Sequence, residues 1–516
     1  MLSLQTAQKR VKYLLIIEFC RIRSYLKKER EYKSGYEQTY ELVPAGRRCA
    51  GAVPSVRVWC RKGRRRKQNR YAGHYYNGAQ QSAFDELVSE FNATVGKEKG
   101  IYVEGYSQGS VSDLEKAVTA AAAGSVGSQE LPNIFSTYAD TAYAMQQQGK
   151  LADLSQFFSA EELSEYVDAY IQEGYFHDDG ALYIFPVAKS TEITMINTTD
   201  WQPFADATGV TLDQLSTTEG IVDVARQYYE WTDSLTPDVP DDGKAFYGRD
   251  SMSNYFIIGM KQMGVDIFDV ENGEVTLRPE KEQIRRLWDN YYVPYVNGWF
   301  ASLGKFRSDD VKTGDILAYT GSSSSSMYFP DQVVLDDRSR PIGYAVLPTP
   351  VMEGGQHINV QQGAGMAVTL SDEQHEFAAC EFLKWFTAKE NNLRFVCDSA
   401  YLPVRKDANS MEALEAVIED QQLSINSKAY DCLSSILSDY DSISFYTPKC
   451  FQNGFAARKV LDYNLSDKAV ADKAAIDEAV AAGTPRAEAV TPYVTDEAFE
   501  TWYEAFCQVL ETAAQS

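Results

Sequence analysis

The hydrophobic positions from residue 73 onward follow helical and strand spacings in alternation. Ala83, Phe84, Leu87, Val88 and Phe91 recur at three- and four-residue intervals, which predicts an amphipathic helix. Short apolar runs predict strands at 101–104, 131–138, 182–187, 193–197, 343–350 and 363–370. Alternating strands and helices favour an α/β protein with mostly parallel sheets, in which a ligand binds beyond the carboxyl ends of the strands.

Three further segments carry helical signals. Residues 113–124 are strong helix formers, with Ser112 as the expected N-cap. Ser371 and Gln374 have the spacing of a capping box and predict the start of another helix. The last third of the chain is acidic and rich in Ala, as at 469–483, and is predicted to be helical.

The charge along the chain is uneven. The 516 residues carry a net charge of −24, yet residues 1–72 hold 19 of the 49 basic residues and only 5 of the 73 acidic ones. Residues 73–516 are therefore strongly acidic, which argues against nucleic acid or an anionic membrane surface as the main partner. A chain of this length is expected to fold into two or three units.

Residues 1–72 are predicted to be a disordered basic leader that is not native to the fold. The polybasic run at 61–70 leaves an arm for nucleic acid or acidic lipid as the alternative. Because no secretory signal is recognisable, we expect this segment to come from a wrong start or a reading-frame error. Five of the eight cysteines lie beyond it, widely spaced; they support neither a zinc site nor a dense disulfide framework, and one long-range disulfide stays open.

The enzyme signals are weak. The sequence GYSQG at 105–109 matches the elbow of serine hydrolases, but too few foldable residues precede Ser107 for that fold, and no histidine stands in a triad context. We therefore interpret it as a polar turn. Adjacent Asp pairs at 178–179, 241–242, 309–310 and 336–337 lie in turn-like contexts and are expected to be solvated. No Walker sequence, dinucleotide fingerprint or EF-hand loop is present, so no cofactor and no metal are expected.

The aromatic content points to a different chemistry. The chain has 33 Tyr, 24 Phe and 7 Trp. Tyr and Trp stack on sugar rings and form hydrogen bonds at one edge. Several tyrosines stand at expected strand ends beside polar residues, among them Tyr138 and Tyr401. The serine tract at 322–326 is read either as a flexible linker or as a binding turn rich in backbone N–H groups.

Seven segments, taken in order, resemble the extracellular solute-binding proteins of ABC importers, family 1, which includes the maltose-, oligosaccharide- and glycerol-3-phosphate-binding proteins. The segments are 74–92, 131–158, 183–201, 314–329, 343–350, 361–386 and 398–408. The resemblance covers residues 73–516 and implies a two-lobe, periplasmic-binding-protein-like (type II) α/β fold with a helical C-terminal part. The ligand would lie in the cleft between the lobes. Members normally begin with a lipoprotein signal, which this sequence does not show.

The resemblance also implies the domain division and the function. Lobe 1 would comprise 73–189 plus 364–400, and lobe 2 would comprise 190–363 plus 401–516. We expect a monomeric, non-enzymatic protein that captures a mono- or oligosaccharide at the extracellular face of the cell membrane, lipid-anchored, or in the periplasm, and delivers it to an ABC permease. The alternatives are a binding protein for glycerol-3-phosphate or glycerophosphodiesters, a sensor partner, and a secreted glycoside hydrolase.

The residues expected to contact the solute come from both lobes and both crossovers. They are Tyr75, Tyr76, Asn77, Tyr138, Asp140, Lys189, Ser190, Thr191, Glu192, Ser322, Ser323, Ser324, Gln361, Gln362, Tyr401 and Arg405. Aromatic faces would stack on the sugar, and carboxylates would accept hydrogen bonds from its hydroxyls.

Overall fold

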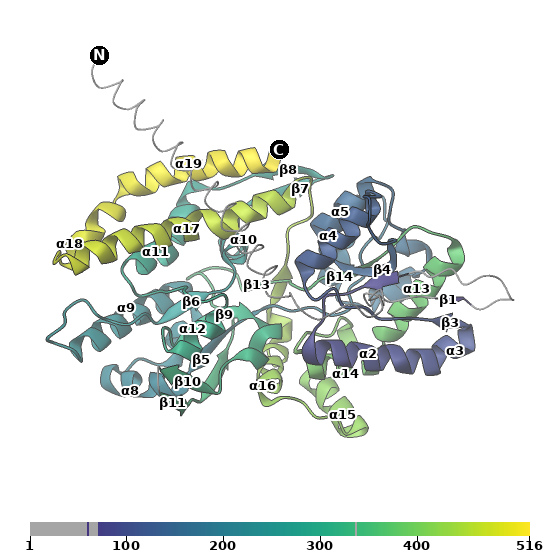
Figure 1. Cartoon of the computed structure of the whole chain (residues 1–516), viewed down its shortest axis with the longest axis horizontal. Helices are drawn as coiled ribbons and strands as arrows, with labels where there is room; N and C mark the ends of the chain where they lie inside the picture. The colour runs from purple at the N-terminus through teal and green to yellow at the C-terminus, as the bar shows by residue number, and fades with distance from the viewer. Residues whose placement is uncertain (1–58, 61–70, 336–337, 516) are drawn as a thin grey trace, which may run out of the picture. The chain divides into compact units, whose positions relative to one another are not determined.

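The computed structural model describes residues 59–60, 71–335 and 338–515 (Figure 1). The prediction for the leader therefore lies largely outside the described residues. Two short strands of that stretch are described: β1 (Trp59–Cys60) pairs with β3 (Ile101–Tyr102), and β2 (Tyr71–Gly73) pairs with β4 (Pro132–Thr137). The first main sheet thus begins two residues before the predicted boundary at residue 73.

The first main sheet has the strand order β14-β4-β2, with β14 at Gly365–Val368. Strand β2 is parallel to β4, whereas β14 is antiparallel to it. Apolar side chains on both faces of this sheet form a core with the surrounding helices. These helices are α2 (Gly78–Ala93), α3 (Val95–Lys99), α4 (Val111–Ala122), α5 (Ala139–Gln147), α6 (Ala160–Ser164), α7 (Asp168–Gln172), α13 (Glu373–Phe386) and α14 (Lys389–Ser399).

The second main sheet has the order β12-β5-β9-β6. Its strands are β12 (Tyr344–Leu347), β5 (Glu192–Asn197), β9 (Ala318–Ser322) and β6 (Tyr247–Arg249). Only β6 and β9 are parallel. Both sheets are therefore mixed, which corrects the expectation of mostly parallel sheets. The reason is that β5 and β14 enter their sheets from crossover segments and are antiparallel to the strands they pair with.

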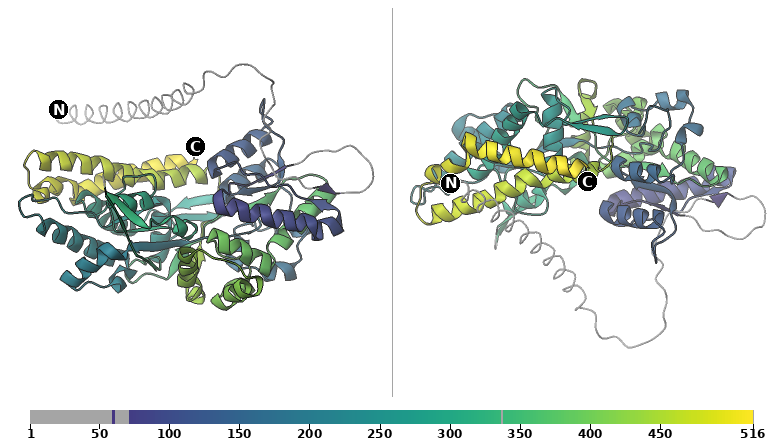
Figure 2. Two further views of the ribbon diagram at one scale, coloured as in Figure 1. Left: turned by 60° about the horizontal axis from the view of Figure 1, so that its bottom comes forward. Right: turned by 90° about the horizontal axis from the view of Figure 1, so that it is seen from above.

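The helices around the second sheet enclose the largest core of the protein. They are α8 (Thr198–Thr208), α9 (Thr218–Ser234), α10 (Met252–Gln262), α11 (Lys281–Val296), α17 (Gly454–Ala481), α18 (Arg486–Val490) and α19 (Asp496–Gln515). Helix α12 (Arg307–Thr313) contributes Val311 to a separate core. Helices α17 and α19 pack side by side, as both views in Figure 2 show. The helical C-terminal part is confirmed.

The remaining elements are short strands and a helical pair. The strands are β7 (Phe268–Glu271), β8 (Glu274–Leu277), β10 (Gln332–Leu335), β11 (Arg338–Pro341), β13 (Ile358–Val360) and β15 (Ser444–Tyr446). Helices α15 (Met411–Gln421) and α16 (Ser427–Leu437) share a third core with α14 and the second sheet. No described helix is long and apolar enough to cross a membrane.

Three details of the predicted elements are wrong. The N-cap of α4 is Ser110, two residues before the predicted Ser112; its hydroxyl accepts a hydrogen bond from the N–H of Asp113 at 3.2 Å. Residues 182–187 form isolated bridges at Leu182 and Phe185 and no strand, because Pro186 has no N–H to donate to a ladder. The cap of α13 is Asp372, one residue after the predicted Ser371; its carboxylate accepts a hydrogen bond from the backbone N–H of His375 at 3.1 Å.

The chain crosses between the sheets through segments that pair with one another. Ser190 and Gln362 form an antiparallel bridge, and Lys189 bridges Leu402 in the same way. The N–H of Gln361 donates to the carbonyl of Tyr446 at 2.8 Å. These crossover segments bring the ends of β4, β5 and β9 to one place.

Candidate functional site

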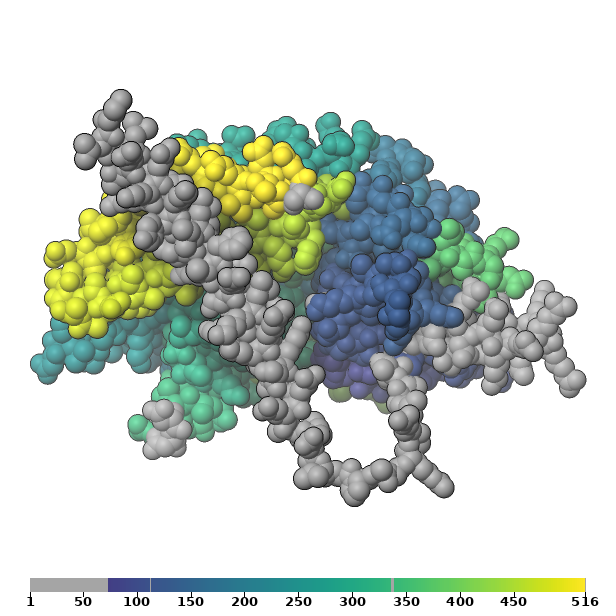
Figure 3. Space-filling model, turned by 45° about the horizontal axis from the view of Figure 1, so that its top comes forward, coloured from purple at the N-terminus to yellow at the C-terminus, as the bar shows by residue number. Residues whose placement is uncertain are grey.

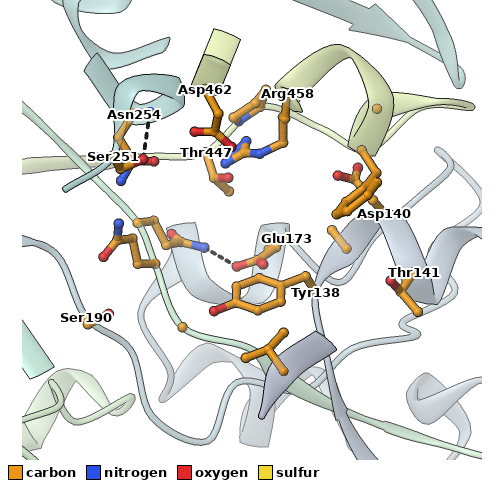
Figure 4. A pocket seen from close by; sticks show the side chains of 18 of the residues that line it. Tyr138, Asp140, Thr141, Glu173, Ser190, Ser251, Asn254, Thr447, Arg458 and Asp462 are labelled. Carbon is orange, nitrogen blue, oxygen red and sulfur yellow. Dashed lines mark hydrogen bonds between the residues drawn. The ribbon is translucent and has the colours of Figure 1, made fainter. Parts of the chain in front are cut away.

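A pocket of about 400 Å³ lies where the crossover segments meet the two sheets. Figure 4 shows labelled side chains pointing into it from several elements. Tyr138 follows the carboxyl end of β4 and precedes α5, so its ring stands at the strand end where α/β proteins bind ligands. Its side chain is 38% exposed. The structure therefore leaves one aromatic face open to a ligand here.

Eight of the sixteen predicted residues lie in the pocket wall. They are Tyr138, Asp140, Ser190, Ser322, Ser324, Gln361, Gln362 and Tyr401. The serine tract is no linker: Ser322 ends β9, and residues 323–328 form a short 3-10 helix. The Ser322 and Ser324 hydroxyls lie 3.0 Å apart. The tract is therefore a structured turn, and Ser322 and Ser324 line the pocket.

Tyr76 is in the hydrophobic core and not in the wall. It is 1% exposed, and its ring packs on Phe84 and Phe395 at centroid distances of 5.5 and 5.2 Å. Tyr75 does not line the pocket; its hydroxyl lies 3.4 Å from that of Tyr401, which does. The chain turns after β2, which directs these rings inward and corrects the expectation that both line the pocket.

The other predicted residues outside the wall make structural contacts. Asn77 is exposed at the N-cap of α2, while Thr191 and Ser323 are fully buried. Arg405 binds Glu165 at 2.7 Å and Asp407 at 3.0 Å, so its charge is not available to the pocket. These placements correct the predicted site.

Lys189 and Glu173 form a buried ion pair at 2.5 Å, with side chains 1% and 8% exposed. The Lys189 ammonium also donates to the carbonyl of Gly363 at 2.9 Å. Gln361 donates to the same Glu173 carboxylate oxygen at 2.5 Å, the contact drawn in Figure 4. Glu173 itself lines the pocket. The crossover segments that contain Lys189 and Gln361 therefore both bind the carboxylate of Glu173.

Glu192 holds a pocket residue in place and does not line the pocket. One of its carboxylate oxygens accepts a hydrogen bond from the Asn254 amide at 2.9 Å, and the other accepts from Arg249 at 2.9 Å. Asn254 lines the pocket from the first turn of α10, whose N-cap is Ser251. Because the Asn254 amide nitrogen is engaged, its carbonyl oxygen is left to accept hydrogen bonds.

The start of α17 contributes side chains that sequence reasoning missed. Arg458 and Asp462, one helical turn apart, both line the pocket (Figure 4). Asp462 accepts a hydrogen bond from the N–H of Ser253 at 3.0 Å. No hydrogen bond or ion pair joins Arg458 to another described residue. A cation and a carboxylate spaced i, i+4 are common on helices, so the sequence held no signal that separated this pair from others.

Two pocket carboxyls are shifted toward their neutral forms. Burial raises the pKa of Asp140 above its ordinary value, against the opposing effect of the Arg458 charge. Burial also raises the pKa of Glu115, although its hydrogen bond from the Thr141 hydroxyl at 3.1 Å acts in the other direction. Carboxyls that are less readily ionised suit an uncharged polar ligand.

The remaining chemical candidates are structural. The Ser107 hydroxyl donates to the carbonyl of Tyr76 at 2.6 Å and accepts from the N–H of Gly109 at 3.0 Å, so it closes a turn. Asp310 is buried and bonded to Arg307, which corrects the expectation that it is solvated. Cys380, Cys397, Cys432, Cys450 and Cys507 are free. Within the described residues, no group of three or more His, Cys, Asp or Glu side chains is arranged to hold a metal ion.

The sequence profile of the bacterial extracellular solute-binding proteins matches residues 86–423. The chain belongs to this family. A search of curated proteins finds no match. Among solved structures, the fold is similar to that of UgpB from Mycobacterium tuberculosis in complex with glycerophosphocholine, with a TM-score of 0.60 at 16% identity over 86% of this chain and 99% of that chain.

Two further structures are similar to this solute-binding protein. The cyclic alpha-maltosyl-1,6-maltose binding protein from Arthrobacter globiformis has a TM-score of 0.56 at 17% identity, over 86% of this chain and 98% of that chain. The ABC substrate-binding protein Lmo0181 from Listeria monocytogenes, in complex with cycloalternan, has a TM-score of 0.57 at 17% identity over 85% and 98%. These likenesses confirm the two-lobe fold, and the pocket is lined by residues from the elements around both main sheets.

Proposed function

We propose that this protein captures a mono- or oligosaccharide outside the cell and delivers it to an ABC permease, without catalysing a reaction. The observation that carries the proposal is the composition of the pocket wall. It combines the open face of Tyr138 with uncharged hydrogen-bonding groups. These groups are Ser190, Ser251, Asn254, Ser322, Ser324, Gln361 and Gln362. Sugars present an apolar ring face together with many hydroxyls, and such a wall complements both.

Closure of the lobes would complete the site. Glu173 and Gln361 line the pocket, and Glu173 binds Lys189 and Gln361, which lie in two crossover segments. A sugar hydroxyl that binds Glu173 or Gln361 would therefore add a contact at the hinge. Hinge closure around a ligand shifts a population that the free protein already contains. The similar structures include a cyclic alpha-maltosyl-1,6-maltose binding protein and a substrate-binding protein in complex with cycloalternan, which agrees with a saccharide here.

A glycerophosphodiester is the second candidate, because Arg458 places in the wall a guanidinium that has no ion-pair partner among the described residues. Arginine is well suited to bind phosphate oxygens. Arg405, which was also expected to contact the solute, is engaged by Glu165 and Asp407. The same wall holds four carboxylates that oppose an anionic ligand, Glu115, Asp140, Glu173 and Asp462, and two further cations that favour one, Lys449 and Lys459.

Calorimetric titration distinguishes the two candidates. We expect a neutral saccharide to bind more tightly than glycerophosphocholine or glycerol-3-phosphate. Tyr138→Ala should weaken sugar binding by roughly 1–3 kcal/mol through lost stacking and burial, and Arg458→Ala should change it little. Tighter binding of the phosphate compounds, lost in Arg458→Ala and retained in Tyr138→Ala, would establish the second candidate. Release of product from a chromogenic glycoside would instead show a hydrolase.

A further inference from the structure

Gln361 in the pocket wall ends a row of three buried side chains. Its amide nitrogen donates to a carboxylate oxygen of Glu173 at 2.5 Å, and the same oxygen accepts from the Lys189 ammonium at 2.5 Å. Gln361 directly follows β13, whereas Glu173 directly follows α7. The row runs from cation to carboxylate to amide, and its amide end lines the pocket.

Asn254 ends a second row of the same kind, built from other elements. Glu192, the first residue of β5, accepts from the Asn254 amide nitrogen and from Arg249, in both cases at 2.9 Å. Arg249 also donates to the Tyr247 hydroxyl at 3.2 Å and lies over the ring of Tyr255. The side chains of this row are buried as well. The pocket wall thus holds two amides, each bound to a buried carboxylate that is paired with a cation.

The carboxylates decide which way the two amides face. A carboxylate paired with a cation accepts hydrogen bonds and does not donate them, so the nitrogen of each amide must be turned toward it. The side-chain oxygens of Asn254 and Gln361 accept no hydrogen bond from a described residue, and neither oxygen is shut off from solvent. Both oxygens are therefore left to accept from a solute in the pocket.

The other neutral groups of the wall are not restricted in this way. The hydroxyls of Ser190, Ser322 and Ser324 can donate or accept, and so can the Gln362 amide, whose side chain binds no described residue. Helices α5 and α17 add charged groups to the same wall. In Figure 3 the blue surface of the segment that contains α5 adjoins the yellow-green surface of the segment that contains the start of α17.

We propose that Glu173 and Glu192 are positioning residues that fix the two pocket amides as hydrogen-bond acceptors. A solute must then present one hydroxyl or amino donor to Gln361 and another to Asn254. An ether, a carboxylate or a phosphodiester at either place would leave a buried acceptor unpaired and is rejected. This inference rests on the proposed function and narrows the solute to sugars whose free hydroxyls reach both amides.

The first experiment locates the sugar hydroxyls that the amides bind. Neutral mono-, di- and trisaccharides of glucose, galactose, mannose and xylose are titrated calorimetrically into the wild type. The tightest is then compared with its monodeoxy and deoxyfluoro analogues, which cannot donate at the altered position. At two positions we expect both analogues to bind about five- to a hundredfold more weakly. One penalty should vanish in Asn254→Ala and the other in Gln361→Ala.

The second experiment lets one amide turn. In Arg249→Met/Glu192→Gln, a glutamine that can donate as well as accept replaces the carboxylate, and no buried charge is left without a partner. The new amide can bind the Asn254 oxygen, so the penalty at the Asn254 position should fall below threefold. The penalty at the Gln361 position should stay. A merely structural role would weaken every analogue alike and leave these ratios unchanged.

A reciprocal variant and a control complete the test. Lys189→Met/Glu173→Gln should relax the Gln361 position and keep the other. Lys406→Met/Asp168→Asn removes an exposed ion pair and should keep both penalties. The two alanine variants decide alone if a paired variant does not fold. Sugar binding whose penalties survive in the alanine variants, or in folded paired variants, overturns the inference and leaves the proposed function standing. Failure of every sugar to bind overturns both.

Discussion

Replacement of Lys189 tests whether the crossover ion pair holds the site together. Lys189→Met removes the ammonium from Glu173 and Gly363 and leaves a carboxylate, 8% exposed, with Gln361 as its remaining side-chain partner. Breaking one side of a buried pair costs about 3–5 kcal/mol, because the other charge stays buried without compensation. We therefore expect the free energy of unfolding to fall by about that amount.

The assay is urea unfolding, with a matched control. Lys406→Met breaks an ion pair with Asp168 whose side chains are 48% and 81% exposed, and exposed pairs contribute about 0–1 kcal/mol. The double variant Lys189→Met/Glu173→Gln removes both charges and should recover much of the loss. The reasoning is refuted if Lys189→Met costs no more than the control, or if the double variant is no more stable than the single one.

Two further predictions separate stability from binding. Tyr76→Ala should destabilise the protein by roughly 3–5 kcal/mol, as expected for a large buried aromatic side chain, and should leave the affinity of the folded protein for its ligand unchanged. Denaturation measures the loss of stability, and calorimetry measures the affinity. A weakened affinity at unchanged stability would contradict this placement of Tyr76. Asp140→Asn should be more stable than the wild type at pH 7. The raised pKa of Asp140 means that the folded state binds its proton more tightly than the unfolded state, so ionisation at neutral pH costs stability. The difference should disappear as the pH falls below the ordinary pKa of a carboxyl group, and a difference that grows on acidification would contradict the assignment.

The sequence predicted most of the elements that carry strong periodicity. The structure contains the helix around Phe84 and Phe91 and the strands predicted at 131–138 and 193–197. They were predictable because the spacing of apolar residues within each segment is enough to define the element. It did not predict the direction of the strands, since that depends on which crossover each strand enters from. The order of segments along the chain led to the family and thus to the two-lobe fold.

The site was predicted only in part. Predicted residues at strand ends or in distinctive tracts, such as Tyr138 and Ser322, line the pocket, because the carboxyl ends of strands open onto it. Tyr76 was misplaced because the turn after β2 decides which neighbouring tyrosine points inward. Glu173 and Arg458 were missed: Glu173 directly follows α7 and Arg458 lies in α17, and the pattern of neither helix indicates that these side chains line the pocket.

The central claim is that this chain binds a saccharide in the pocket and releases it unchanged. The most direct measurement is a calorimetric titration with the best-binding saccharide, followed by chromatographic analysis of the recovered sugar. We predict saturable binding of one sugar molecule per chain, a matching loss of affinity in Tyr138→Ala, and complete recovery of intact sugar. Cleaved sugar, or an affinity that Tyr138→Ala leaves unchanged, would contradict the account.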